Sequence, residues 1–213
     1  MRIPSDGFLA KPTTLGTHQA ILVLHAWWGL NETIKSICTN LKDEGYLVFA
    51  PDLYHGRMAD TVKGAEALSE TLFKNFNNAR MDVSDAATFL MQHPDNLHSK
   101  VSVLGFSLGA FYALDVSITM PKHIQSVVTF YGTGPEDFSG SNAKYCCHFA
   151  ETDDFEPFEN VDALHYALEK AKRPAKFYKY LGTEHWFMEP DRPEYNAAAA
   201  DLAWERTLNF LRE

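Results

Sequence analysis

The pentapeptide Gly-Phe-Ser-Leu-Gly at residues 105–109 has the residue types and spacing of a nucleophilic serine held in a tight turn. Residues 101–104 before it are apolar and rich in β-branched side chains, which predicts a buried strand, and the apolar stretch after it predicts a helix. In a strand–turn–helix, G-x-S-x-G exposes the serine because side chains at the glycine positions would collide with backbone. Ser107 is therefore a candidate nucleophile, and an ordinary Gly-Ser turn between a strand and a helix is the alternative interpretation. The helix start offers the backbone N–H of Leu108 to an oxyanion.

A nucleophilic serine needs an acid and a base further along the chain, in that order. His185 is the last of nine histidines and follows the last predicted strand, so we expect it to accept the serine proton. Asp153 follows the preceding strand, where a turn can aim its carboxylate at His185. Asp154 is the alternative acid, and a solvated loop is the alternative interpretation for either residue.

The loop after the first long strand is where a second oxyanion donor is expected. Its sequence is His-Ala-Trp-Trp-Gly at residues 25–29, and the backbone N–H of Trp27 is the candidate. Aromatic side chains near the expected site can form the walls of an apolar substrate pocket, although packing in the core is their other common role. The candidates for such walls are Trp27, Trp28, Tyr131, Phe155 and Trp186.

Hydrophobic periodicity predicts strands that alternate with helices. Strands are expected at residues 20–25, 46–50, 101–104, 125–131, 144–150 and 175–181, and helices at residues 32–44, 60–74, 78–92, 157–172 and 194–211. Residues 1–19 are expected to form edge hairpin strands or an irregular lead-in. This order predicts an α/β fold with a single, mostly parallel sheet, helices on both faces, and one domain over residues 1–213. Functional residues of such sheets lie at the carboxyl ends of the strands, where all three candidates fall.

Composition excludes several kinds of partner. The net charge of −9 argues against nucleic acid and anionic membranes, which attract basic surfaces. The longest apolar stretch, residues 20–30, is too short to span a bilayer, and the N-terminus lacks the apolar core of a signal peptide, so we expect a cytoplasmic protein. Cys38, Cys146 and Cys147 are expected as core residues, because an odd count with two adjacent members does not suit a disulfide framework. We expect a monomer that needs no metal or organic cofactor.

Several short blocks, taken in order, resemble the dienelactone hydrolase family of α/β-hydrolases. They are residues 25–31, 50–54, 105–109, 152–157, 184–187 and 203–211. The resemblance implies an α/β-hydrolase fold with Ser107 as nucleophile, Asp153 as acid and His185 as base. It also places Trp27 and Leu108 on the family's oxyanion donors.

Three positions depart from the family pattern. The best-known members use cysteine where this chain has Ser107, and they carry a glutamate near the thiol where it has Ala26. An arginine that helps hold a substrate carboxylate is replaced by Glu189, which we expect to repel one.

The sequence therefore predicts a serine hydrolase that cleaves a small carboxylic ester or a lactone, and Glu189 favours an ester that is uncharged or held differently. A thioesterase or another acyl hydrolase is one alternative, and a non-catalytic ligand-binding protein on the same fold is another. Whether residues 60–92 cover the site is left open. His55 and Arg57 also follow a strand, so a contact with substrate is conceivable, but a surface loop is the simpler interpretation.

Overall fold

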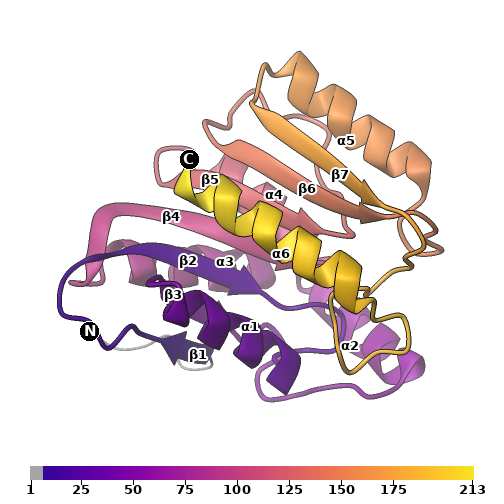
Figure 1. The fold of residues 1–213 in the computed structure, drawn as a ribbon, viewed down its shortest axis with the longest axis horizontal. Helices are drawn as coiled ribbons and strands as arrows, with labels where there is room; N and C mark the ends of the chain where they lie inside the picture. Colours follow the sequence, from indigo (N-terminus) through magenta and orange to yellow (C-terminus); the bar gives the residue numbers. More distant parts are fainter. Residues whose placement is uncertain (1–6) are drawn as a thin grey trace.

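The computed structural model describes residues 7–213, so the expected lead-in is described only from residue 7 onward. Within that range, seven strands form one sheet in the order β1-β3-β2-β4-β5-β6-β7 (Figure 1). Only β1 pairs antiparallel, with β3, and the other neighbours are parallel. The predicted mostly parallel sheet is confirmed. The strands are β1 (Gly7–Ala10), β2 (His18–Leu24), β3 (Leu47–Pro51), β4 (Asn96–Phe106), β5 (Ile124–Phe130), β6 (Lys144–Ala150) and β7 (Ala175–Tyr180).

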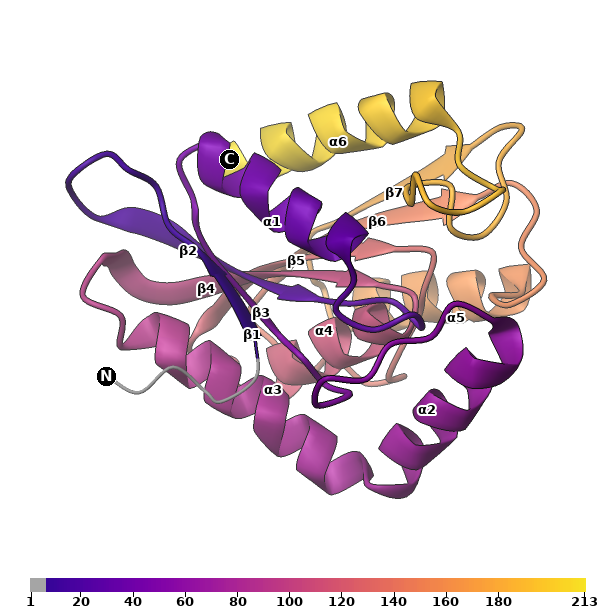
Figure 2. The ribbon, with the colours of Figure 1, turned by 90° about the horizontal axis from the view of Figure 1, so that it is seen from below.

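Helices cover both faces of the sheet, as predicted (Figure 2). Helices α1 (Glu32–Asp43) and α6 (Ala197–Arg212) lie on one face. The other face is covered by α3 (Phe76–Met91), α4 (Leu108–Thr119) and α5 (Phe158–Lys170), with α2 (Val62–Lys74) on the same side. Each face has its own apolar core, and the adjacent Cys146 and Cys147 of β6 point into opposite cores. Both are fully buried free thiols, which fits the core role expected for them.

The largest difference from the predicted elements is in β4, which begins at Asn96 rather than at residue 101. Asn96 pairs with His18 of β2, and the register then shifts before Val101 pairs with Ala20. The irregular segment between them has one leucine and three polar residues, so its sequence lacks the apolar pattern of a strand. Within residues 7–213, no helix combines the length and the apolarity needed to cross a membrane.

Candidate active site

Ser107 lies at the apex of a sharp turn between β4 and α4. Its φ of +50° is in the left-handed region, which is strained for a residue with a side chain. The turn is held by the Ser107 N–H, which donates to the carbonyl of Phe130 at 2.9 Å. A Cβ at Gly105 would lie 2.4 Å from the oxygen of Gly109, and one at Gly109 would lie 2.3 Å from the oxygen of Leu24. Because these contacts are with backbone, neither position has room for a side chain.

A third glycine packs against the turn from the neighbouring strand. A Cβ at Gly132, just after β5, would lie 2.6 Å from the oxygen of Ser107 and 2.7 Å from the Cβ of Ala110. Gly132 was not among the residues that the sequence pointed to. No local signal identifies it, because the contact joins segments that follow different strands.

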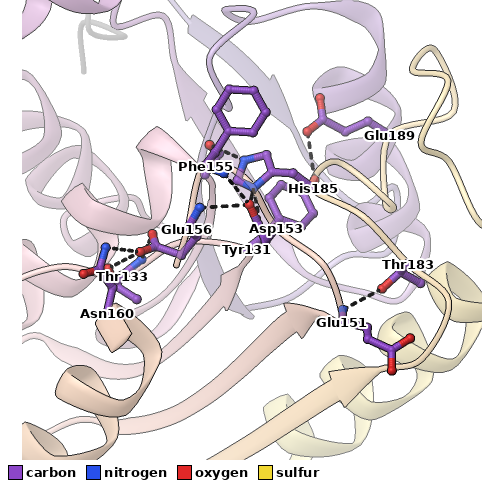
Figure 3. A network of polar contacts seen from close by, with 11 residues as sticks. Tyr131, Thr133, Glu151, Asp153, Phe155, Glu156, Asn160, Thr183, His185 and Glu189 are labelled. Carbon is purple, nitrogen blue, oxygen red and sulfur yellow. Dashed lines mark hydrogen bonds and ion pairs between the residues drawn. The ribbon is translucent and has the colours of Figure 1, made fainter. Parts of the chain in front are cut away.

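A continuous chain of hydrogen bonds joins Ser107, His185 and Asp153. Ser107 Oγ lies 2.9 Å from His185 Nε2, and His185 Nδ1 lies 2.7 Å from Asp153 Oδ2. The His185 and Asp153 side chains are only 4% and 8% exposed. Because Nδ1–H donates to the carboxylate, Nε2 is left to accept the Ser107 proton. Figure 3 shows Asp153 and His185 facing each other from two different loops. This arrangement can deprotonate a serine hydroxyl and stabilise the resulting imidazolium.

The Asp153 carboxylate is fixed by its own loop. Its Oδ1 also accepts the backbone N–H groups of Phe155 and Glu156, both at 2.9 Å. A backbone bond from the Thr152 N–H to the Thr183 carbonyl, at 3.1 Å, ties this loop to the segment that carries His185. Asp154, the alternative acid, is exposed to solvent. The structure thus places Asp153, rather than Asp154, beside His185.

The segment that carries His185 is closed by Asn196. The Asn196 N–H donates to the carbonyl of Phe187 at 3.1 Å, and its Nδ2 donates to the carbonyl of Gly182 at 3.4 Å. Its Oδ1 accepts the N–H of Ala199 at 3.1 Å and so caps α6. The position of His185 therefore depends on the docking of α6 as well as on β7.

The expected oxyanion donors lie on two segments that meet. The tight approach of Gly109 to the carbonyls of Leu24 and His25 holds the start of α4, with Leu108, against the end of β2. At a helix N-terminus the first N–H groups have no intrahelical acceptor, so the Leu108 N–H is suited to bind an anion. Trp27 lies two residues beyond His25, on the facing loop.

His25 fixes that facing loop. Its ring is fully buried, with Nδ1–H donating to the Ala26 carbonyl at 2.8 Å and Nε2 accepting the Leu53 N–H at 3.1 Å. Burial lowers the pKa of His25, which favours the neutral ring that this pair of bonds requires. The sequence placed His25 at the start of this loop without indicating a role for its ring. In the structure, its two hydrogen bonds fix the loop that leads to Trp27.

A cavity of about 260 Å³ opens at Ser107 and His185. Three phenylalanines give it apolar walls: Phe73 from α2, Phe111 from α4, and Phe155 from the acid loop. The full lining is Phe73, Ser107, Leu108, Phe111, Tyr131, Thr133, Gly134, Phe155, Glu156, Asn160 and His185. Glu156 is the one carboxylic acid among these lining residues. They include no lysine and no arginine. Because Phe73 contributes, part of the segment at residues 60–92 does border the site.

The aromatic residues proposed as pocket walls divide into two groups. Tyr131 and Phe155 line the cavity. Trp28 and Trp186 are only 3% and 5% exposed and pack on each other with ring centroids 5.1 Å apart, outside the lining. Trp27 is half-buried and lies against both Phe155 and Trp186. The tryptophans thus pack behind the residues that line the cavity and do not line it themselves.

Four larger cavities are lined by neither Ser107 nor His185. One of about 310 Å³ is bordered by His55 and Arg57 together with residues of α2 and α3. Another, of about 510 Å³, lies between α5 and the sheet, behind Asp153. His55 and Arg57 therefore do not border the space in front of Ser107. Within residues 7–213, no group of three or more His, Cys, Asp or Glu side chains is arranged to hold a metal.

Glu156 ties the acid loop to the loop after β5. Its Oε2 accepts the Thr133 N–H at 2.9 Å, and its Oε1 accepts the Thr133 hydroxyl at 2.9 Å and the Asn160 amide at 2.8 Å (Figure 3). The contact with Thr133 lacks a sequence signal, because it joins loops that follow different strands.

The expectation that Glu189 would repel a substrate carboxylate is wrong. Glu189 is fully buried, its Oε1 accepts the Tyr131 hydroxyl at 2.8 Å, and it does not line the cavity. A turn produces this placement: Trp186 has a φ of +65°, and the Glu189 N–H donates to the Trp186 carbonyl at 2.8 Å. Burial raises the pKa of Glu189 to about 8. The residue faces the interior, on the far side of Tyr131 from the cavity.

Comparison with known proteins agrees with the fold and identifies the family. The sequence model of the dienelactone hydrolase family matches residues 5–213. The chain is 31% identical over 219 residues to a protein named "Putative carboxymethylenebutenolidase" from Aquifex aeolicus, covering 97% of this chain and 92% of that one. It is 32% identical over 220 residues, with the same coverage, to "Protein usf" from Aquifex pyrophilus. A crystal structure described as a putative dienelactone hydrolase from Klebsiella pneumoniae superposes with a TM-score of 0.85 at 22% identity, covering 99% of this chain and 96% of that one.

Proposed function

Because the chain belongs to the dienelactone hydrolase family, we propose that it hydrolyses small, uncharged carboxylic esters or lactones with Ser107 as nucleophile. The observation that carries this proposal is the continuous hydrogen-bond chain from Ser107 Oγ through His185 to Asp153. A protein that only binds ligand has no need for a base poised on a strained serine. The support from Gly105, Gly109 and Gly132 points the same way, because it holds that serine in one conformation.

In the proposed reaction, Ser107 Oγ attacks the carbonyl carbon while His185 Nε2 takes the hydroxyl proton. Asp153 stabilises the imidazolium through Nδ1–H. The N–H groups of Leu108 and Trp27 donate to the oxyanion. Collapse of the tetrahedral intermediate expels the alcohol, which receives the proton from His185, and leaves an acyl group on Ser107. Water, deprotonated by the same ring, then attacks the acyl carbon. The bond between the acyl carbon and Ser107 Oγ breaks, His185 returns the proton to Ser107, and the carboxylic acid leaves.

The cavity supports a small and uncharged substrate. Its volume of about 260 Å³ is below the usual range for drug-sized ligands, and three phenylalanines contribute to its walls. The Glu156 carboxylate borders it, and none of its lining residues is a cation that can pair with a substrate carboxylate. Lactones that carry a carboxylate are therefore disfavoured, because the Glu156 carboxylate repels them. Glu189 has no part in this repulsion.

Labelling with a fluorophosphonate, read by intact mass and peptide mapping, tests the nucleophile. We expect one adduct, on Ser107, that is lost in both Ser107→Ala and His185→Ala, with ester turnover reduced about 10⁶-fold in each. His98→Ala is the matched control, since His98 is exposed and lies on β4 away from the elbow. A folded wild-type protein without an adduct would favour the ligand-binding alternative.

Matched substrates test the charge preference. A neutral lactone and the same lactone with a carboxylate should differ by about tenfold or more in kcat/KM, in favour of the neutral one. Glu156→Gln keeps the side-chain shape, removes the charge, and should narrow the difference. Equal rates for the two lactones would contradict this part of the proposal, and thioesters of the same acyl group would show whether sulfur leaving groups are preferred.

A further inference from the structure

Tyr131 stands between the His185 ring and a buried carboxyl group. Its ring borders the cavity and packs against the His185 ring, with centroids 4.8 Å apart and planes at 54°. Its hydroxyl points away from the cavity and donates to Glu189 Oε1 at 2.8 Å. Figure 3 shows His185, Tyr131 and Glu189 in one cluster. Tyr131 is thus held at both ends, by the histidine ring on one side and by Glu189 on the other.

We propose that Glu189 is a positioning residue for the base: by holding the Tyr131 hydroxyl, it keeps the His185 ring aligned between Ser107 and Asp153. The inference rests on the proposed function of this site. Glu189 touches neither the serine nor the cavity, so its effect passes through Tyr131.

The backbone around the pair shows that Tyr131 needs such support. Tyr131 has a φ of +39°, and Trp186, next to His185, has a φ of +65°, so strained residues lie on both sides of the contact between the two rings. Conformations of this kind persist only where surrounding contacts over-determine them. The Tyr131 N–H is bonded to the His148 carbonyl at 2.7 Å, and the hydroxyl bond to Glu189 fixes the other end of the residue.

The neutral form of Glu189 suits this role. Burial raises its pKa to about 8, and the neighbouring Asp191 and Glu194 act in the same direction, while Arg192 and the bond from Tyr131 oppose them. Its second oxygen, Oε2, is buried without a hydrogen-bond partner among the described residues. Ionisation therefore places a negative charge in the interior while Oε2 has no hydrogen-bond donor. Water can reach that oxygen only if the segment after His185 opens. We expect that opening to release Tyr131 and to lower turnover on the alkaline side.

The test measures kcat and KM for a neutral ester from about pH 6 to 9.5, with kcat divided by the fraction of serine labelled by fluorophosphonate. Tyr131→Phe and Glu189→Leu each remove the hydroxyl–carboxyl bond and should lower kcat about tenfold, with KM within about twofold. Glu189→Gln keeps an acceptor for Tyr131 but cannot ionise. It should retain kcat at pH 7 and lose the fall in turnover near pH 8. Glu184→Gln is the control, because it removes an exposed charge from the same segment and is not one of the charges that raise the pKa of Glu189.

The outcomes separate the inference from the proposed function. Wild-type kcat in both Tyr131→Phe and Glu189→Leu would overturn the inference alone, and so would an unchanged alkaline limb in Glu189→Gln. The inference would be supported if Glu189→Gln kept the turnover that Glu189→Leu loses. A general loss of folding would not produce that recovery or change the pH profile. A wild-type protein that turns over no ester and takes no label would overturn the proposed function, and the inference with it.

Discussion

Substitution of Gly109 by alanine perturbs the closest backbone contact at the site. The added Cβ would lie 2.3 Å from the Leu24 oxygen and 2.6 Å from the His25 oxygen, whereas real Cβ contacts essentially never fall below 3.0 Å. The start of α4 and the end of β2 must therefore separate by about 0.7 Å or more. Neither atom belongs to a flexible side chain, so the movement falls on the segments that carry Leu108 and Trp27.

Two consequences follow, of different sizes. Overpacking of this kind lowers the free energy of unfolding by about 1–3 kcal/mol. Displacing an oxyanion donor costs more in rate, because a misplacement of about 1 Å lowers turnover about 100-fold and loss of one donor lowers it about 10²–10³-fold. We therefore expect Gly109→Ala to remain folded but to lose at least about 100-fold in kcat.

Urea unfolding and ester turnover, measured on the same preparation, separate the two effects. The matched control is Gly140→Ala, whose Cβ would lie 3.5 Å from Ile118 Cγ2, an ordinary contact, and which should change neither quantity appreciably. A folded Gly109→Ala protein with wild-type kcat would refute the assignment of the oxyanion donors to these two segments. A loss of stability with unchanged kcat in the folded fraction would refute it equally.

Two further substitutions probe the buried carboxyl groups. Asp153→Asn should lower kcat about 10⁴-fold while the protein stays folded, because asparagine can still accept the Phe155 and Glu156 N–H groups but no longer holds His185 as the Nδ1–H tautomer; a loss under tenfold in steady-state kinetics would contradict this. Glu189 contributes stability that is fully present below its unfolded pKa of about 4.5 and is lost as pH rises through its folded pKa of about 8, so the native state binds more protons over that window. Relative to Glu189→Gln, the free energy of unfolding of the wild type should therefore fall by a few kcal/mol between about pH 4.5 and 8. A constant difference between the two proteins in urea unfolding across that range would show that Glu189 does not hold a proton in the native state.

The features that sequence reasoning predicted are those specified by short segments. The elbow at Gly105, Ser107 and Gly109 is one strand–turn–helix, so its steric requirements are written in five consecutive residues. The parallel sheet followed from hydrophobic runs that alternate with helical periodicity. The placement of Asp153 and His185 followed from the sheet, because parallel strands bring their carboxyl ends to one edge.

The features that sequence reasoning missed depend on contacts between distant segments. Gly132 is required by Ser107, and Glu156 binds Thr133, yet each pair joins loops that follow different strands. Glu189 was placed wrongly because four residues after His185 can lead toward the cavity or into the core. The left-handed turn at Trp186 decides between them, and a tryptophan at a positive φ is not a conformation that local propensity predicts.

The closure of the His185 segment by Asn196 also has a consequence for biosynthesis. On the ribosome, the elbow with Ser107 emerges long before β7, and His185 gains its fixed place only when Asn196 has capped α6 and bonded to Phe187 and Gly182. Under the proposed function, a nascent chain therefore carries Ser107 before its base is in place, and we expect it not to transfer acyl groups to itself or to its neighbours. The order of the residues along the chain delays reactivity until the last helix has docked.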